Sequence, residues 1–157
     1  MDANARQALI ARYQAGYAQV LEALKGITDA ELDARSTAED WTAREVAHHL
    51  ADSETTSYIR LRRLLAEDEP TIDGYDEAEF ARRLRYDRAI GASLAVFRAV
   101  RDSSAELLDR LNETDWQRHG THSESGDYFV ETWLEIYAAH AFDHADQIRR
   151  ARSSAAK

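Results

Sequence analysis

The stretch Tyr137-Ala-Ala-His140-Ala-Phe-Asp-His144 lies in a segment, residues 128–150, whose apolar side chains recur every three or four positions. This spacing predicts an amphipathic helix and places residues four apart on one face. His140 and His144 therefore share the apolar face of that helix. The other members of the face are Val130, Trp133, Leu134, Tyr137, Ala141 and Ile148. Imidazoles in a core are costly unless they find partners. The pair either bonds to backbone or carboxylate groups or shares one metal ion.

A third histidine lies on the apolar face of another predicted helix. Thr42-Ala-Arg-Glu45 is a capping box, the pattern that opens a helix. The face that follows holds Val46, His49, Leu50, Ser53, Ser57, Leu61 and Leu64. If His49 meets His140 and His144, three imidazoles can hold one ion and leave a coordination position open, as catalytic metal sites do. The neighbouring His48 lies about 100° away round the helix. We expect it to face solvent or a subunit interface.

The remaining apolar spacing predicts two further long helices. One covers residues 10–24 and the other residues 86–111, with a weaker helical stretch at residues 76–84. Four amphipathic helices in a chain of 157 residues predict an all-α fold. We expect a four-helix bundle that forms a single domain over residues 1–157, with the three-histidine site between its second and fourth long helices.

The segments between the helices are polar and contain the residues that favour turns. Pro70 and Gly74 mark one loop, and residues 112–126 are expected to be mostly loop. His119 and His122 fall in this second loop, where exposed histidines are the ordinary expectation. His122 can still overhang the metal site, because the loop leads directly into the last helix.

Composition excludes several classes of function. The chain has a formal net charge of −9 and a pI of about 5.1, which argues against nucleic acid and anionic membrane surfaces as partners. It has no cysteine, so disulfides, thiolate metal sites and a cysteine nucleophile are excluded. Ala141 stands where a zincin protease motif needs glutamate. With no apolar leader or spanning segment, a cytoplasmic protein is expected.

Two motifs taken together resemble the DinB-like superfamily, which is also called YfiT-like. The first is Trp41-Thr-Ala-Arg-Glu-Val-Ala-His48-His49-Leu-Ala-Asp-Ser-Glu54, and the second is His140-x-x-x-His144-x-x-Gln147-Ile148. The resemblance spans essentially the whole chain. It implies a four-helix bundle in which His49, His140 and His144 hold a divalent ion, since the first ligand of the family aligns with His49 and not with His48.

The same resemblance implies a reaction. Relatives in this family include thiol S-transferases, which conjugate bacillithiol or mycothiol to electrophiles, and a thiol-dependent maleylpyruvate isomerase. We therefore expect a metal-dependent enzyme that transfers a low-molecular-weight thiol to an electrophilic small molecule. The absence of cysteine suits this scheme, because the small molecule supplies the sulfur. Two alternatives stay open: a hydrolase that uses metal-activated water, and a non-catalytic stress or interaction module in which the metal only ties two helices together.

The cofactor and the partners follow from these expectations. Three imidazoles suit zinc, nickel or iron. Asp52 lies about one turn from His49 and is a candidate to support it by hydrogen bonding. No general base is evident. The expected partner is a small-molecule substrate, and a homodimer is expected because relatives pair through helices.

Overall fold

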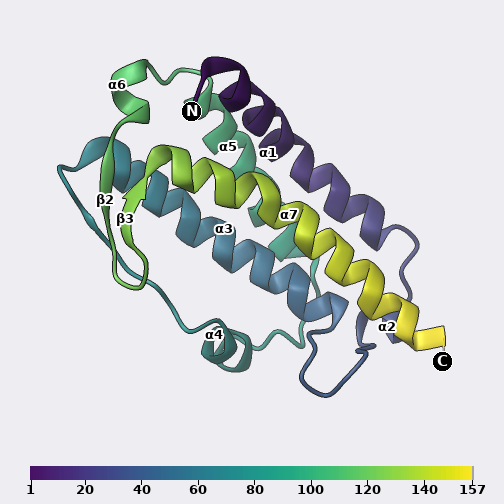
Figure 1. The fold of residues 1–157 in the computed structure, drawn as a ribbon. Coiled ribbons are helices and arrows are strands. Elements are labelled where there is room, and N and C mark those ends of the chain that lie inside the picture. Colours follow the sequence, from purple (N-terminus) through teal and green to yellow (C-terminus); the bar gives the residue numbers. More distant parts are fainter. Residues whose placement is uncertain (157) are drawn as a thin grey trace.

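Four long helices dominate the structure, a computed structural model that describes residues 1–156 (Figure 1). Their bounds are Ala3–Leu24 for α1, Ala43–Ala66 for α3, Gly91–Leu108 for α5 and Val130–Ser153 for α7. Helix α7 packs against α1 and α3, and α5 packs against the same two helices from the other side. The order round the bundle is therefore α1, α7, α3, α5, so α1 and α3 lie diagonally opposite each other. The predicted four-helix bundle is confirmed.

The capping box expected at Thr42 forms in the structure. Thr42 accepts a hydrogen bond from the backbone N–H of Glu45, whose carboxylate accepts one from the N–H of Thr42, and this capping box opens α3. A second capping box, between Thr28 and Glu31, opens the short helix α2, Asp29–Leu32. Gly26 ends the preceding segment with a φ of 65°, a conformation that glycine adopts without a steric penalty.

Helix α5 begins later than its apolar spacing predicts. The predicted helix starts at residue 86, whereas α5 starts at Gly91, after a short helix α4 over Glu77–Arg83. The predicted helix is interrupted because Arg85 has a φ of 57°, outside the helical region. The Tyr86 side chain then turns inward, where it is buried and donates a hydrogen bond to Asp52. Tertiary contacts at Tyr86 therefore override the local helical pattern.

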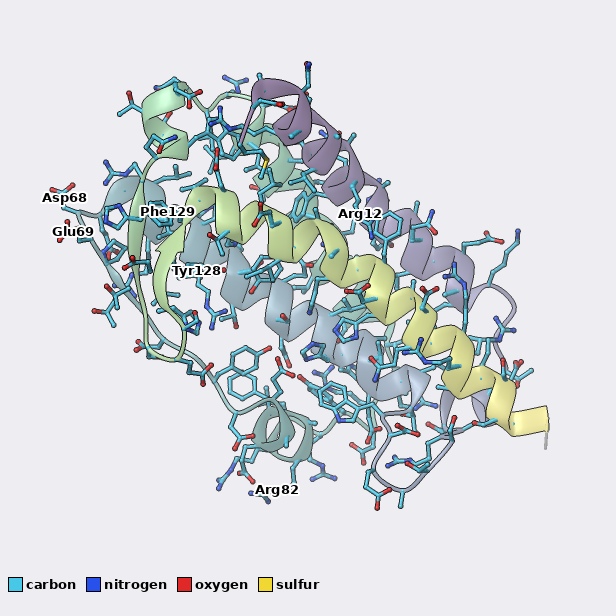
Figure 2. All side chains as sticks on the ribbon, viewed as in Figure 1. Arg12, Asp68, Glu69, Arg82, Tyr128 and Phe129 are labelled. Carbon is cyan, nitrogen blue, oxygen red and sulfur yellow. The ribbon has the colours of Figure 1, made fainter. Side chains whose placement is uncertain are left out.

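A small sheet occupies much of the segment that was expected to be loop. After a one-turn helix α6, Glu113–Trp116, strand β2 covers His119–His122 and pairs antiparallel with β3, Gly126–Phe129. The two-residue strand β1, Thr71–Ile72, pairs parallel with β2. On β3, Tyr128 is buried and Phe129 exposed (Figure 2). The expectation of a loop over residues 112–126 was wrong, because strands this short carry almost no periodic signal.

The close approach of two chain segments fixes the position of this sheet. A Cβ atom at Gly120 would lie 2.3 Å from the backbone oxygen of Pro70, so β2 can pair with the segment of β1 only with glycine there. The remaining element is a 3₁₀ turn, η1, over Ser154–Ala156. None of the helices within residues 1–156 is both long and apolar enough to cross a membrane.

The core divides into two apolar clusters with a polar layer between them. One cluster surrounds Trp133 and Tyr13, and the other surrounds Phe97 and Leu50. Buried polar side chains separate them at mid-height of the bundle, and we call this group the polar layer. Its members are Ser53, Glu54, Ser57, Arg101 and Ser104. The layer lies directly beneath the predicted histidine site, since His140 of α7 reaches it.

Candidate metal centre

The structure brings the three predicted histidines together between α3 and α7. One ring nitrogen from each of His49, His140 and His144 lies within 4.8 Å of the other two. The ring centroids of His49 lie 5.5 Å from His140 and 4.7 Å from His144. The Nε2 atoms of His140 and His144 are 3.1 Å apart. Because His140 and His144 come from successive turns of one helix, their spacing is set by the helix itself.

The outward-facing nitrogens of the two α7 histidines have acceptors nearby. Nδ1 of His144 lies 2.7 Å from Oε1 of Gln147, which can only accept, so Nδ1 carries the proton. Nδ1 of His140 lies 3.4 Å from Oε1 of Glu54 but makes no hydrogen bond within residues 1–156. The proton on Nδ1 of His144 leaves the Nε2 lone pair of that ring turned toward Nε2 of His140. Metal-bound histidines show the same pattern, in which the second ring nitrogen donates to an amide or carboxylate oxygen.

The inward-facing nitrogens fit a cation. Two Nε2 atoms that face each other at 3.1 Å need a proton or a positive ion between them. His49 adds a third imidazole, and its Nδ1 is buried with no hydrogen-bond partner in the described part of the chain. A buried polar nitrogen without a partner is costly. A single ion shared by three imidazoles would relieve both problems, so the donor set fits a divalent transition metal.

Burial keeps the site in the form that binds metals. Desolvation, together with the neighbouring histidines, lowers the pKa of His49 to about 3. Burial also lowers the pKa of His144 to about 4, with a further contribution from His140. Both rings are therefore neutral at neutral pH, as a metal ligand must be. Trp41 packs its ring 4.9 Å from that of His49, edge to face, and covers the outer side of the cluster.

Glu54 and Arg101 form a buried ion pair beneath the histidines. The side chain of Glu54 is fully buried and that of Arg101 is 2% exposed. Arg101 also donates to the backbone oxygens of Tyr13 and Tyr137, which ties α5 to α1 and α7. Neither residue was expected to have a role from the sequence. A signal was present: Glu54 follows Leu50 by four residues, and Arg101 follows Phe97 by four, so each charge falls on a core-facing stripe.

Two expectations about neighbouring residues need correction. Asp52 accepts a hydrogen bond of 2.6 Å from the hydroxyl of Tyr86, and no bond from it to His49 is found within residues 1–156. His48 does not face solvent: it is fully buried. Its Nδ1 lies 2.7 Å from Oγ of Ser93, and its Nε2 lies 3.0 Å from the backbone oxygen of Arg88. The chain that connects α4 to α5 covers this side of α3, which the spacing on α3 alone cannot reveal.

His122 reaches the site from the hairpin, as the sequence allowed. It is 9% exposed, and with His140 it lines a cavity of about 250 Å³ between the hairpin, α3 and α7. Other polar residues in the wall of this cavity are Ser53, Arg60, Tyr75 and Tyr137. His119 instead remains on the surface, where its ring stacks on Phe129 at 5.0 Å. The candidate metal centre therefore has an adjoining polar pocket of small-molecule size.

Comparison with known proteins agrees with this site. The model of the DinB superfamily matches residues 12–148, so the chain belongs to that superfamily. A protein of Oceanobacillus iheyensis named "Putative metal-dependent hydrolase" is 37% identical over 122 residues, which cover 78% of this chain and 71% of that protein. A protein of the same name from Halalkalibacterium halodurans is 30% identical over 111 residues, covering 71% and 65% of the two chains.

A solved structure is similar over nearly the whole chain. YfiT from Bacillus subtilis aligns with a TM-score of 0.88 and 29% identity, covering 94% of this chain and 86% of that one. It is described as "a probable metal-dependent hydrolase with an unusual four-helix bundle topology". The resemblance expected from the motifs around His49 and His140 is thus confirmed at the level of family and fold.

Proposed function

We propose that this protein is a metal-dependent enzyme in which His49, His140 and His144 hold one divalent transition metal ion. The observation that carries the proposal is the convergence of three imidazoles, with ligand atoms within 4.8 Å of one another. The names of the relatives and of YfiT support it. Zinc, nickel and iron all suit three imidazoles. Three protein ligands would leave a coordination position for the reacting group of a small-molecule substrate.

The surrounding residues hold the ligands in place. Gln147 accepts from Nδ1 of His144 and so fixes the tautomer that presents Nε2 to the centre of the site. The carboxylate of Glu54 lies 3.4 Å from Nδ1 of His140, and its negative charge favours a cation at the site. Trp41 shields His49 from water. A bound divalent cation lowers the pKa of a coordinated water or thiol, which supplies a nucleophile at neutral pH.

Two reactions use such a nucleophile. Hydrolysis by activated water comes first, because the two relatives are named "Putative metal-dependent hydrolase" and YfiT is described as "a probable metal-dependent hydrolase". Transfer of a low-molecular-weight thiol to an electrophile is the second, and the absence of cysteine in the chain suits it. In either reaction the protein contributes the ligands, the covered site and the polar pocket beside His140.

Turnover with and without a thiol separates the two reactions. The zinc-, nickel- and iron-loaded protein is incubated with a panel of chromogenic esters and amides, and separately with 1-chloro-2,4-dinitrobenzene and a small thiol. Metal-dependent release from the esters or amides without thiol supports hydrolysis, and metal-dependent conjugation supports thiol transfer. If metal removal lowers the thermal stability but no turnover occurs with any substrate, the metal is structural and the enzymatic proposal fails.

We also propose that the protein forms a homodimer through its helices. Several large apolar side chains are exposed on helix surfaces: Leu21, Ile59, Val96 and Ile136. Analytical ultracentrifugation tests this directly. A mass near 17.8 kDa, that of one chain, at high protein concentration would refute it.

A further inference from the structure

The pocket beside His140 contains a positive charge, that of Arg60, which forms no ion pair within residues 1–156. The guanidinium of Arg60 donates to the backbone oxygen of Asp73 at 2.6 Å and to the hydroxyl of Tyr137 at 3.3 Å. No ion pair to Arg60 is found among residues 1–156, and its Nε is buried without a partner. A buried N–H without an acceptor is costly. An acceptor that the chain does not supply is therefore expected at this wall of the pocket.

Tyr75 presents a second unmatched donor to the same pocket. Its hydroxyl is buried and makes no hydrogen bond within the described residues, and burial raises its pKa to about 12. It therefore stays protonated and can donate. Ser53 and Tyr137 add hydroxyl groups to the wall, and His140 connects the pocket to the histidine cluster. The unmatched groups converge from α3 and from the segment before α4, which is the layout of a small-molecule site.

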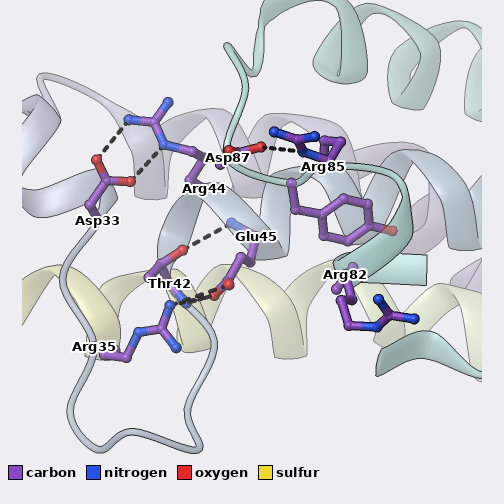
Figure 3. Close-up of a pocket in the computed structure, with 10 residues that line it drawn as sticks. Asp33, Arg35, Thr42, Arg44, Glu45, Arg82, Arg85 and Asp87 are labelled. Atoms are coloured by element: carbon purple, nitrogen blue, oxygen red, sulfur yellow. Dashed lines mark hydrogen bonds and ion pairs between the residues drawn. The ribbon is translucent and has the colours of Figure 1, made fainter. Parts of the chain in front are cut away.

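The arginines of another pocket are arranged differently. A cavity of about 290 Å³ near the start of α3 is lined by Arg35, Arg44, Arg82 and Arg85 (Figure 3). Each of these pairs with an acidic side chain, and Arg44 holds both oxygens of Asp33. Their charges are already neutralised, so that pocket offers no free cation. Arg60 has no such partner in the described part of the chain, which points to an anion from outside it.

The acidic residues near Arg60 do not replace that anion. Glu77 and Glu124 also line the pocket, but both are exposed at its rim, where solvent screens their charge. The cavity volume of about 250 Å³ is below the roughly 300–1,000 Å³ of pockets that hold drug-sized ligands. The acceptor therefore belongs to a small molecule.

We propose that Arg60 and Tyr75 form a subsite for a carboxylate group of the substrate. The carboxylate pairs with the guanidinium of Arg60 and accepts a hydrogen bond from Tyr75, while the reacting part of the molecule lies at the histidine cluster. The substrate class is thus a small carboxylic acid with a second, reactive group. This inference rests on the proposed function for the role of the histidines, but the binding of the carboxylate depends on Arg60.

Isothermal titration calorimetry with two matched probes tests the subsite. The probes are monomethyl succinate, which carries one carboxylate, and the corresponding uncharged amide, methyl succinamate. The zinc-loaded protein is expected to bind the acid at least about tenfold more tightly than the amide, as for a hydrogen bond to a charged group. Arg60→Met should abolish this preference, Arg60→Lys should restore part of it, and Tyr75→Phe should reduce it.

Arg63→Met is the matched control. Arg63 lies on α3 one turn after Arg60 and donates to the backbone oxygen of Thr71, so it makes the same kind of loop contact outside the pocket. This variant should bind the acid like the unmodified protein. If Arg60→Met lowers the melting temperature but keeps the preference for the acid, Arg60 only anchors the loop, and the subsite is refuted.

Chelator-treated protein separates this proposal from the metal proposal. The acid should still bind better than the amide without metal, and Arg60→Met should remove that difference. The subsite proposal is wrong if two results occur together: acid binding is lost when the metal is removed, and the metal-loaded Arg60→Met protein binds the acid as tightly as the unmodified protein. In that case the carboxylate binds the ion. If Arg60→Met does not fold, the test uses Arg60→Lys and Tyr75→Phe instead. The proposal is overturned if both of these variants prefer the acid over the amide as strongly as the unmodified protein does.

Discussion

Replacing Arg101 by methionine should destabilise the protein strongly. The change removes the positive partner of Glu54, whose carboxylate is completely buried and has an Oε2 atom that already lacks a hydrogen-bond partner. It also removes the hydrogen bonds that the guanidinium donates to the backbone oxygens of Tyr13 and Tyr137. Breaking a buried ion pair by removing one partner costs about 3–5 kcal/mol, because the other charge stays buried and uncompensated.

The assay is urea unfolding followed by circular dichroism, together with thermal melting. For a chain of this size each kcal/mol lowers the melting temperature by roughly 2–4 °C, so Arg101→Met should lower it by about 6–20 °C. Arg98→Met is the matched control on the same helix. Arg98 is 64% exposed and pairs with Asp102 at the surface, so its loss should cost less than about 1 kcal/mol.

A double variant shows whether the ion pair is the cause. Glu54→Gln combined with Arg101→Met leaves no buried charge, so its destabilisation should be smaller than the sum of the two single effects. The reasoning is refuted if Arg101→Met stays within about 1 kcal/mol of the unmodified protein, or if the two single effects simply add.

Three further predictions follow from the polar layer and the histidines. In the folded metal-free protein His49 and His144 stay neutral, because their pKa values are about 3 and 4, whereas in the unfolded chain they take up protons near pH 6.5. The free energy of unfolding should therefore be highest above pH 7. It should then fall with acidification by up to about 1.4 kcal/mol per pH unit for each histidine, and a flat urea-unfolding profile from pH 7 to 5 would contradict this. Gly16→Ala should lower stability by about 1–3 kcal/mol, since its Cβ would lie 2.6 Å from Nη2 of Arg101, and equal or greater stability in urea would show that the layer is loosely packed. Glu54→Gln should weaken zinc binding about 10–100-fold in competition with a chromogenic chelator, and unchanged affinity would show that Glu54 does not support His140.

The sequence predicted the parts of the fold that local signals encode. The capping box at Thr42 acts within one turn of chain and was found where expected. The pairing of β1 with β2 depends instead on the approach of Pro70 to Gly120, two residues fifty positions apart. No local pattern reports that contact, so the sheet was missed.

The same distinction explains what was predicted of the site. His140 and His144 share a face because of helical geometry, and the motif resemblance joined them to His49; the structure places all three together. The burial of His48 arises from residues 88–93, which return over α3 from outside its helix. Arg60 and Tyr75 are ordinary surface-type residues in the sequence, and only the fold shows that their donors lack partners in one pocket.

Metal content is the most direct test of the central claim. Elemental analysis by inductively coupled plasma mass spectrometry should find about one divalent transition metal ion per chain in the purified protein. His49→Ala, His140→Ala and His144→Ala should each lose most of it. His48→Gln, which alters the adjacent buried histidine and can keep hydrogen bonds to Ser93 and Arg88, should retain it. Full metal retention in folded His140→Ala protein would contradict the account and leave these residues as ordinary core histidines.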